Sequence, residues 1–287
     1  MTKLRWRQVG PIALTLMMVA GAGAANAATV TLYDGSLNTA PGSQGWSSNV
    51  PAGATQTVSG GTTTLDSTSS DALQAGYARL GVPFGNRVAG YTLRFDVQVL
   101  AEDHTTSGTA DNNSDGIGDR AGFSIIALGS DRTGIELGFW RADVVTTDRI
   151  WAQNEGAQKP PPTGTRFTHG EGTPFNPGTA LTRYDLSFLN STYSLYANAD
   201  YSSSILTGAV RDYQNEGAPY NIPNFSFMGD NTTSANGSFR VSRVDVTDAP
   251  ITPTGPVPVP FEFSPTIGLL GLGAWGLWQH RKKQLSK

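Results

Sequence analysis

Strict alternation of apolar and polar residues over positions 91–99 is the feature that most constrains the fold of this chain. Tyr91, Leu93, Phe95, Val97 and Val99 share one parity, and the residues between them are polar. Successive side chains of a β-strand point to opposite faces, so the pattern predicts a strand with one face in a core and the other in water.

The same period of two recurs along the body of the chain. Thr55–Asp66 contains two alternating runs around Gly60-Gly61, which predicts a hairpin with a two-residue turn that needs positive φ. Positions 184–195 predict a second hairpin that turns at Asn190-Ser191. Two fuller apolar runs, Ala121–Leu128 and Gly134–Trp140, predict more buried strands joined by Ser130-Asp131-Arg132.

The last strand changes parity along its length. Phe239 and Val241 share one parity, whereas Val244 and Val246 share the other, so we expect a β-bulge near Ser242-Arg243. No run of ten or more residues in the body has clean helical periodicity, and the chain contains 34 glycines. These features predict an all-β fold: a jelly-roll or concanavalin-like sandwich of two antiparallel sheets.

The N-terminus has the pattern of a secretory signal peptide, predicted to span residues 1–27. Lys3, Arg5 and Arg7 precede an apolar run over 9–22, and Ala25-Asn26-Ala27 follows it. We expect cleavage between Ala27 and Ala28, which makes the secretion machinery a partner.

The C-terminus predicts a membrane segment. A proline-rich linker over 251–263 leads to an apolar helix over 264–280 and a basic tail over 281–287. The apolar run is slightly short for a bilayer, but snorkelling of basic side chains and local thinning absorb such a mismatch. Positive charge stays cytoplasmic, so the body is expected to be exported and anchored at the membrane or cell surface. The alternative is a buried C-terminal helix of a globular core.

This order of features resembles the PEP-CTERM class of bacterial sorting signals, in the variant that carries Pro260-Phe261-Glu262. The resemblance implies processing near this motif by an exosortase, a membrane-bound transpeptidase or protease. The motif departs from the commoner Pro-Glu-Pro form, which leaves the cut site open.

Eight short segments of the body form a recognisable set. They are Thr31–Gly35, Gln44–Trp46, Gln74–Tyr77, Ala121–Ser124, Gly134–Trp140, Ile150–Asn154, Phe167–Glu171 and Arg211–Tyr213. Together they resemble the choice-of-anchor family, more closely its Y-type surface domain. The resemblance covers nearly all of residues 29–247 and implies a surface location and a concanavalin-like jelly roll, with no assigned reaction.

Composition limits the classes of partner. The body, residues 28–250, has the size of one large β domain. It carries 13 Lys and Arg against 22 Asp and Glu, a net charge of about −9, which argues against nucleic acid as a partner. The chain has no cysteine, so disulfides, thiolate metal sites and cysteine nucleophiles are excluded.

Residues 111–119 form the sharpest local pattern for a metal. Oxygen ligands at loop positions 1, 3 and 5, a glycine at 6, a backbone carbonyl at 7 and a carboxylate at 9 match a calcium loop. Position 12 is Gly122, so the bidentate glutamate of a full EF-hand is missing. The alternative is a solvated acidic turn. The predicted Ca²⁺ ligands are Asp111, Asn113, Asp115, Ile117 and Asp119.

A second candidate site combines aromatic and polar residues close in sequence. Aromatic rings stack on sugar rings, and amides and carboxylates bind sugar hydroxyls, so the group predicts binding of an envelope or matrix polysaccharide. The alternative is a set of half-buried sandwich residues, each with one polar partner. The members are Trp140, Trp151, Gln153, Asn154, His169 and Glu171.

Catalytic patterns are weak, and we expect a protein that is not an enzyme. Glu136 has no second acid two or four residues along its strand, as retaining glucanases require. A serine triad would need His104 or His169, and the chain lacks the Gly-x-Ser-x-Gly elbow. The sequence therefore predicts an exported, carbohydrate-associated or structural surface module. A structural or adhesive domain without glycan binding and, less favoured, a glycoside hydrolase are the alternatives.

Overall fold

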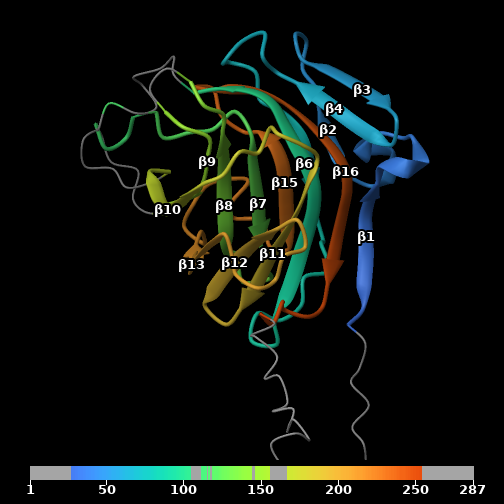
Figure 1. Cartoon of the computed structure of the whole chain (residues 1–287), viewed down its shortest axis with the longest axis vertical. Helices are drawn as coiled ribbons and strands as arrows, with labels where there is room; N and C mark the ends of the chain where they lie inside the picture. The colour runs from blue at the N-terminus through green and yellow to red at the C-terminus, as the bar shows by residue number, and fades with distance from the viewer. Residues whose placement is uncertain are drawn as a thin grey trace, which may run out of the picture.

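The computed structural model describes residues 27–104, 111–114, 116, 118–143, 146–155 and 167–253. These residues form two packed antiparallel sheets (Figure 1), which confirms the predicted all-β sandwich. Helical structure in this part of the chain is limited to two 3₁₀ turns, Gly35–Leu37 and Pro41–Gln44. The apolar core lies between the sheets, and it includes Tyr91, Phe95 and Val97 as their alternation predicts.

The first sheet has the strand order β13-β12-β11-β6-β16-β4-β3, and β1 also pairs with β16. Both predicted hairpins are confirmed here: Gly60 and Gly61 have φ of 58° and 77°, and Asn190 has φ of 55°. The strands are β1 (Thr29–Asp34), β3 (Thr55–Ser59), β4 (Thr62–Asp66), β6 (Tyr91–Asp103), β11 (Thr182–Leu189), β12 (Thr192–Ala197), β13 (Leu206–Ala209) and β16 (Asn236–Thr247).

The predicted bulge in the last strand is confirmed. The register of β16 against β6 shifts between Val241 and Arg243, so that Phe239, Val241, Val244 and Val246 are all buried despite their different parities. A second shift lies between Ser238 and Phe239. The extra residue of the bulge reverses which alternate side chains face the core, so the apolar residues on both sides of it are buried.

The second sheet has the order β10-β9-β8-β7-β15-β5-β2, and β14 pairs with β8. Its central strand β7 is buried on both faces, because Tyr213 and Tyr220 pack against Ile126 and Leu128 on the side away from the core. The strands are β2 (Ser47–Asn49), β5 (Ala75–Arg79), β7 (Ser124–Leu128), β8 (Thr133–Trp140), β9 (Arg149–Gln153), β10 (His169–Pro174), β14 (Arg211–Asp212) and β15 (Phe225–Asp230).

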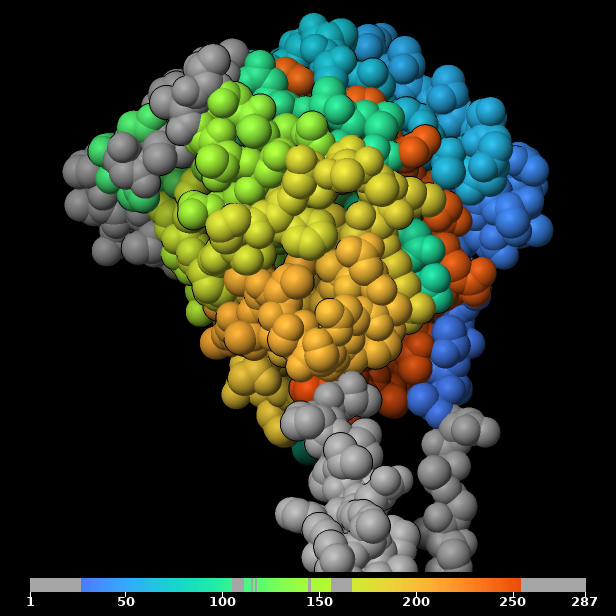
Figure 2. All heavy atoms as spheres, in the orientation of Figure 1, coloured from blue at the N-terminus to red at the C-terminus, as the bar shows by residue number. Residues whose placement is uncertain are grey.

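Both ends of the described chain leave from one end of the sandwich. Thr29 pairs with Thr247 across β1 and β16, which lie side by side in Figure 1. The 12 residues of β16 span about 40 Å, so the segment 231–235 that precedes this strand lies at the opposite end. Figure 2 shows one face of the molecule, largely covered by the yellow-to-orange segment that contains β11, β12 and β13.

The predicted terminal signals fall outside the described residues, except for Ala27 and Ala28 at the expected cleavage point and residues 251–253 at the start of the predicted linker. The sorting motif Pro260-Phe261-Glu262 and the C-terminal helix are among them. Within the ranges that the structure describes, no helix combines the length and apolar character that crossing a membrane requires.

Candidate functional site

The aromatic residues predicted to bind sugar are buried in an internal cluster. Trp140 and Trp151 are 2% and 1% exposed, and their rings meet edge to face with centroids 5.6 Å apart. His104 covers one face of Trp140, and the His169 ring lies 4.0 Å from that of Trp151. Trp151 also lies over Gly138, where an added Cβ would be 2.8 Å from the indole. The indole faces thus contact protein and offer no open stacking surface.

Asn154 and Glu171 belong to a neighbouring polar group at the edge of the second sheet. Arg211 Nη2 donates to Glu171 Oε2 at 2.7 Å and to Asn154 Oδ1 at 3.3 Å, and the Tyr193 hydroxyl donates to Glu171 Oε1 at 2.7 Å. Burial acts to raise the pKa of Glu171, but the hydrogen bonds from Arg211 and Tyr193 outweigh it and hold that pKa below its usual value. These contacts join β10 to β12 and β14.

The predicted calcium loop is described in part, because Asp115 and Ile117 lie outside the described residues. Asp111 Oδ2 accepts the Gly116 N–H at 2.8 Å, and the buried Asp119 accepts the backbone N–H of Asn112. Asn113 lies in the same turn and is partly buried. In the described part of the chain, no three His, Cys, Asp or Glu side chains gather as metal ligands. Binding of Ca²⁺ by this loop therefore stays a prediction.

A groove runs over β5 because the outward residues of this strand are small. Tyr77 points into the core and is fully buried, whereas Gly76 and Ala78 face away from it. Phe227 pairs with Ala78 across β15 and β5, and its ring extends over Gly76, where an added Cβ would lie 2.4 Å from Phe227 Cζ. The floor of the groove is therefore formed by the half-buried Ala78 and by the Phe227 ring, which covers the buried Gly76.

Neutral polar side chains and the segment 218–222 form the walls of this groove. Its volume of about 790 Å³ is in the range of ligand pockets. Amides and hydroxyls of this kind can exchange hydrogen bonds with a polyhydroxylated ligand. The polar residues that line it are Ser47, Asn49, Gln74, Asn112, Asn231, Thr232, Thr233 and Ser234, with Arg120 and Asp230 as the charged members.

Arg120 contributes to the groove from a buried network around Glu136. Its Nη1 donates to Gln153 Oε1 at 3.1 Å, which places Gln153 here and not with the tryptophans. Its Nη2 donates to Asn231 Oδ1 at 2.7 Å and lies 3.3 Å from Glu136 Oε1. The Tyr220 hydroxyl donates to the other oxygen of Glu136. Burial acts to lower the pKa of Arg120, but Glu136, with Tyr220 and Asp230, outweighs it, so the pKa lies above its usual value.

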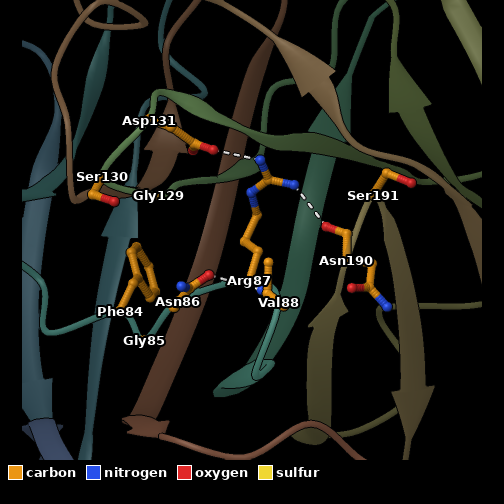
Figure 3. A pocket seen from close by; sticks show the side chains of 10 residues that line it. All are labelled: Phe84, Gly85, Asn86, Arg87, Val88, Gly129, Ser130, Asp131, Asn190 and Ser191. Atoms are coloured by element: carbon orange, nitrogen blue, oxygen red, sulfur yellow. Dashed lines mark hydrogen bonds and ion pairs between the residues drawn. The ribbon is translucent and has the colours of Figure 1, made fainter.

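A second pocket, of about 540 Å³, opens between three loops near the chain termini (Figure 3). Arg87 stands at its centre: Nη1 donates to the Asn190 carbonyl oxygen at 2.6 Å, and Nη2 pairs with Asp131. Phe84, on its wall, stacks on the buried Tyr91 with centroids 4.9 Å apart. Both terminal nitrogens of Arg87 therefore hold the loops together. This leaves the pocket with fewer polar groups for a ligand than the groove has.

Sequence reasoning did not find the groove. Its residues come from segments far apart in the chain, and most are ordinary polar residues. One local signal was available: Gly76 and Ala78 have the same parity on either side of Tyr77, which indicates a strand whose outer face carries only small residues.

No family model matches this sequence, and no curated protein matches it. Solved structures of similar shape include a mutant form of the Emp46p carbohydrate recognition domain, at 10% identity and a TM-score of 0.46 over 77% of this chain and 97% of that one. Another is a carbohydrate esterase of the Shiga toxin-encoding bacteriophage phi24B, at 11% identity and a TM-score of 0.45 over 77% and 100%. A third is the VIP36 exoplasmic/lumenal domain bound to Ca²⁺ and Man3GlcNAc, at 7% identity and 0.42 over 77% and 89%. At such identities and TM-scores below 0.5, this chain is similar to them in fold alone.

Proposed function

We propose that this chain is an exported β-sandwich protein, retained at the cell envelope by its C-terminal segment, that binds carbohydrate in the groove over β5. The floor of the groove is the observation on which the binding proposal depends. Gly76 and Ala78 leave it flat, and Phe227 supplies an aromatic ring against which the apolar face of a sugar can pack. The surrounding amides and hydroxyls suit the hydroxyl groups of the sugar.

The arrangement of the chain ends supports this role. The described chain begins and ends beside the Thr29–Thr247 pair, while Asn231–Ser234, at one end of the groove, precede β16 at the far end of the sandwich. A protein anchored through its C-terminal segment would therefore present that end of the groove away from the membrane. The two terminal sequence patterns are the support for export and anchoring.

A glycan array tests the binding proposal. The full chain, purified in mild detergent, is expected to bind a subset of glycans, and Phe227→Ala is expected to weaken that binding at least about tenfold. Val88→Ala, which trims a side chain that is 71% exposed in the other pocket, serves as the control and should bind normally. Circular dichroism checks that both variants fold. A wild-type chain that binds no glycan rejects the proposal.

A structural or adhesive role is the second candidate, and one observation favours it. Trp140, Trp151, Asn154 and Glu171 all make internal contacts that stabilise the sandwich. An envelope protein that binds no glycan but whose deletion weakens cell adhesion would support this role. The hydrolase hypothesis gains no support from the described residues, because Glu136 and Glu171 pair with two different arginines in separate networks.

A further inference from the structure

We infer that the groove over β5 takes a neutral glycan, and that Glu136 is the specificity-determining residue that excludes acidic glycans. This inference rests on the proposed function and deepens it. Glu136 acts through Arg120 and does not touch the ligand, because its side chain is fully buried whereas Arg120 lines the groove.

Both terminal nitrogens of the cation in the groove, Arg120, are bonded to protein, and its Nε is buried. Arg120 Nη1 donates to Gln153 Oε1, and Nη2 is shared between Asn231 Oδ1 at 2.7 Å and Glu136 Oε1 at 3.3 Å. The guanidinium also stacks on Phe167, with Cζ 4.2 Å from the ring centroid. A uronate arriving in the groove would have to break these contacts to form an ion pair, so it would lose hydration without gaining a partner.

The Glu136 carboxylate is held in place by two further donors. Asn231 Nδ2 donates to Oε1 at 3.1 Å, and the Tyr220 hydroxyl donates to Oε2. Tyr220 belongs to the wall of the groove, so the network that neutralises Arg120 also fixes the wall. A charge-neutral site of fixed shape is suited to hydroxyl groups more than to carboxylates.

The remaining charged residue of the groove adds little negative charge at neutral pH. Asp230 accepts hydrogen bonds from the Ser67 hydroxyl at 2.9 Å and the Thr232 N–H at 3.1 Å. Burial nevertheless raises its pKa to about 8, so the neutral acid predominates at pH 7. Arg120 and Glu136 then balance each other. Beyond the groove, the net charge of the body, about −9, repels polyanions.

The experiment compares neutral oligosaccharides with uronic-acid oligomers of equal length, using the full chain in mild detergent. We expect the wild type to prefer the neutral set at least about tenfold, with little dependence on NaCl. Glu136→Gln keeps the size of the side chain and removes its charge, which leaves the Arg120 cation uncompensated. We expect binding of uronates to rise about tenfold, and to fall again as NaCl is added, while neutral binding changes less than about threefold.

Asp185→Asn is the matched control, because Asp185 is also a buried carboxylate that pairs with an arginine, Arg183, but on the other sheet. It should gain no uronate binding. A wild-type preference for uronates, or a folded Glu136→Gln chain with no gain, overturns the inference. If Glu136→Gln does not fold, the wild type alone tests the inference: a preference for neutral oligosaccharides that changes little with NaCl supports it, and any other result overturns it.

Failure of this inference is distinguishable from failure of the proposed function. Binding that Phe227→Ala abolishes but that favours uronates rejects the neutral-glycan inference alone. Absence of any binding rejects both.

Discussion

The imidazole ring of His104 lies parallel to the indole of Trp140, with centroids 4.0 Å apart and 2° between the planes. His104 Nδ1 lies 2.8 Å from Glu102 Oε2, and the same carboxylate accepts the backbone N–H groups of Gly122 and Arg141. This buried unit joins the end of β6 to the residues before β7 and after β8. It holds in place the aromatic cluster that covers the outer face of β8 and β9.

Replacing His104 with alanine should therefore destabilise the sandwich. The change exposes one face of Trp140 and removes a partner from the buried Glu102 carboxylate, which we expect to cost about 2–4 kcal/mol. Urea unfolding of the purified chain measures the loss. Leu37→Ala, at a side chain that is 62% exposed, is the control and should change stability by less than about 0.5 kcal/mol. Equal losses in the two variants would contradict the role of the stack.

Gly76→Ala should damage the groove directly. The new Cβ would lie 2.4 Å from Phe227 Cζ and 2.9 Å from the Met228 carbonyl oxygen, so the ring must leave its place on the floor. We expect glycan affinity to fall at least about tenfold and stability to fall by about 1–3 kcal/mol. Gly85→Ala, whose nearest new contact is 3.6 Å away, should bind normally. Unchanged binding by Gly76→Ala would place the ligand elsewhere.

Glu171→Gln should affect stability and leave glycan binding unchanged. Its hydrogen bonds with Arg211 and Tyr193 hold the folded-state pKa below the usual value, so its contribution is present above about pH 4.5 and is lost as the pH falls. We expect the wild type to be about 1–2 kcal/mol more stable than the variant at pH 7. Denaturant titrations from pH 7 to pH 3 should show that difference shrinking. A loss of glycan binding in a folded variant would instead support Glu171 as a ligand residue.

Asp230→Asn should change the pH dependence of stability in the direction opposite to that expected for Glu171→Gln. Burial raises the folded-state pKa of Asp230 to about 8, so the folded protein holds a proton that the unfolded chain has released above about pH 4. The stability of the wild type should therefore fall, relative to the variant, as the pH rises from 5 to 8. The slope is at most about 1.4 kcal/mol per pH unit. Parallel stability curves for the two proteins would show that Asp230 is not protonated at neutral pH.

Mass spectrometry of the protein recovered from the cell envelope tests the predicted processing. We expect an N-terminus at Ala28 and a C-terminus near Pro260-Phe261-Glu262, as the two terminal patterns predict. Recovery of the uncut chain from the cytosol would contradict both export and sorting.

The sequence alone determined the fold class and much of the strand arrangement. Alternation over Tyr91–Val99, the Gly60-Gly61 turn and the change of parity after Val241 each report a local property: which side of a strand faces the core, or where the backbone must turn. Such properties depend on neighbouring residues, so they can be read from a short segment.

The candidate site was decided by the tertiary structure. Alternation shows that Trp140 and Trp151 point away from the core, but it does not show whether that outer face meets solvent. His104, just after β6, and His169, on β10, cover the two tryptophan rings, whereas over β5 the half-buried Phe227 covers Gly76 and a groove remains beside it. Segments more than a hundred residues apart bring Arg120, Asn231 and Phe227 to the groove. Which outer face is buried and which stays open is set by these long-range contacts, and no local pattern encodes them.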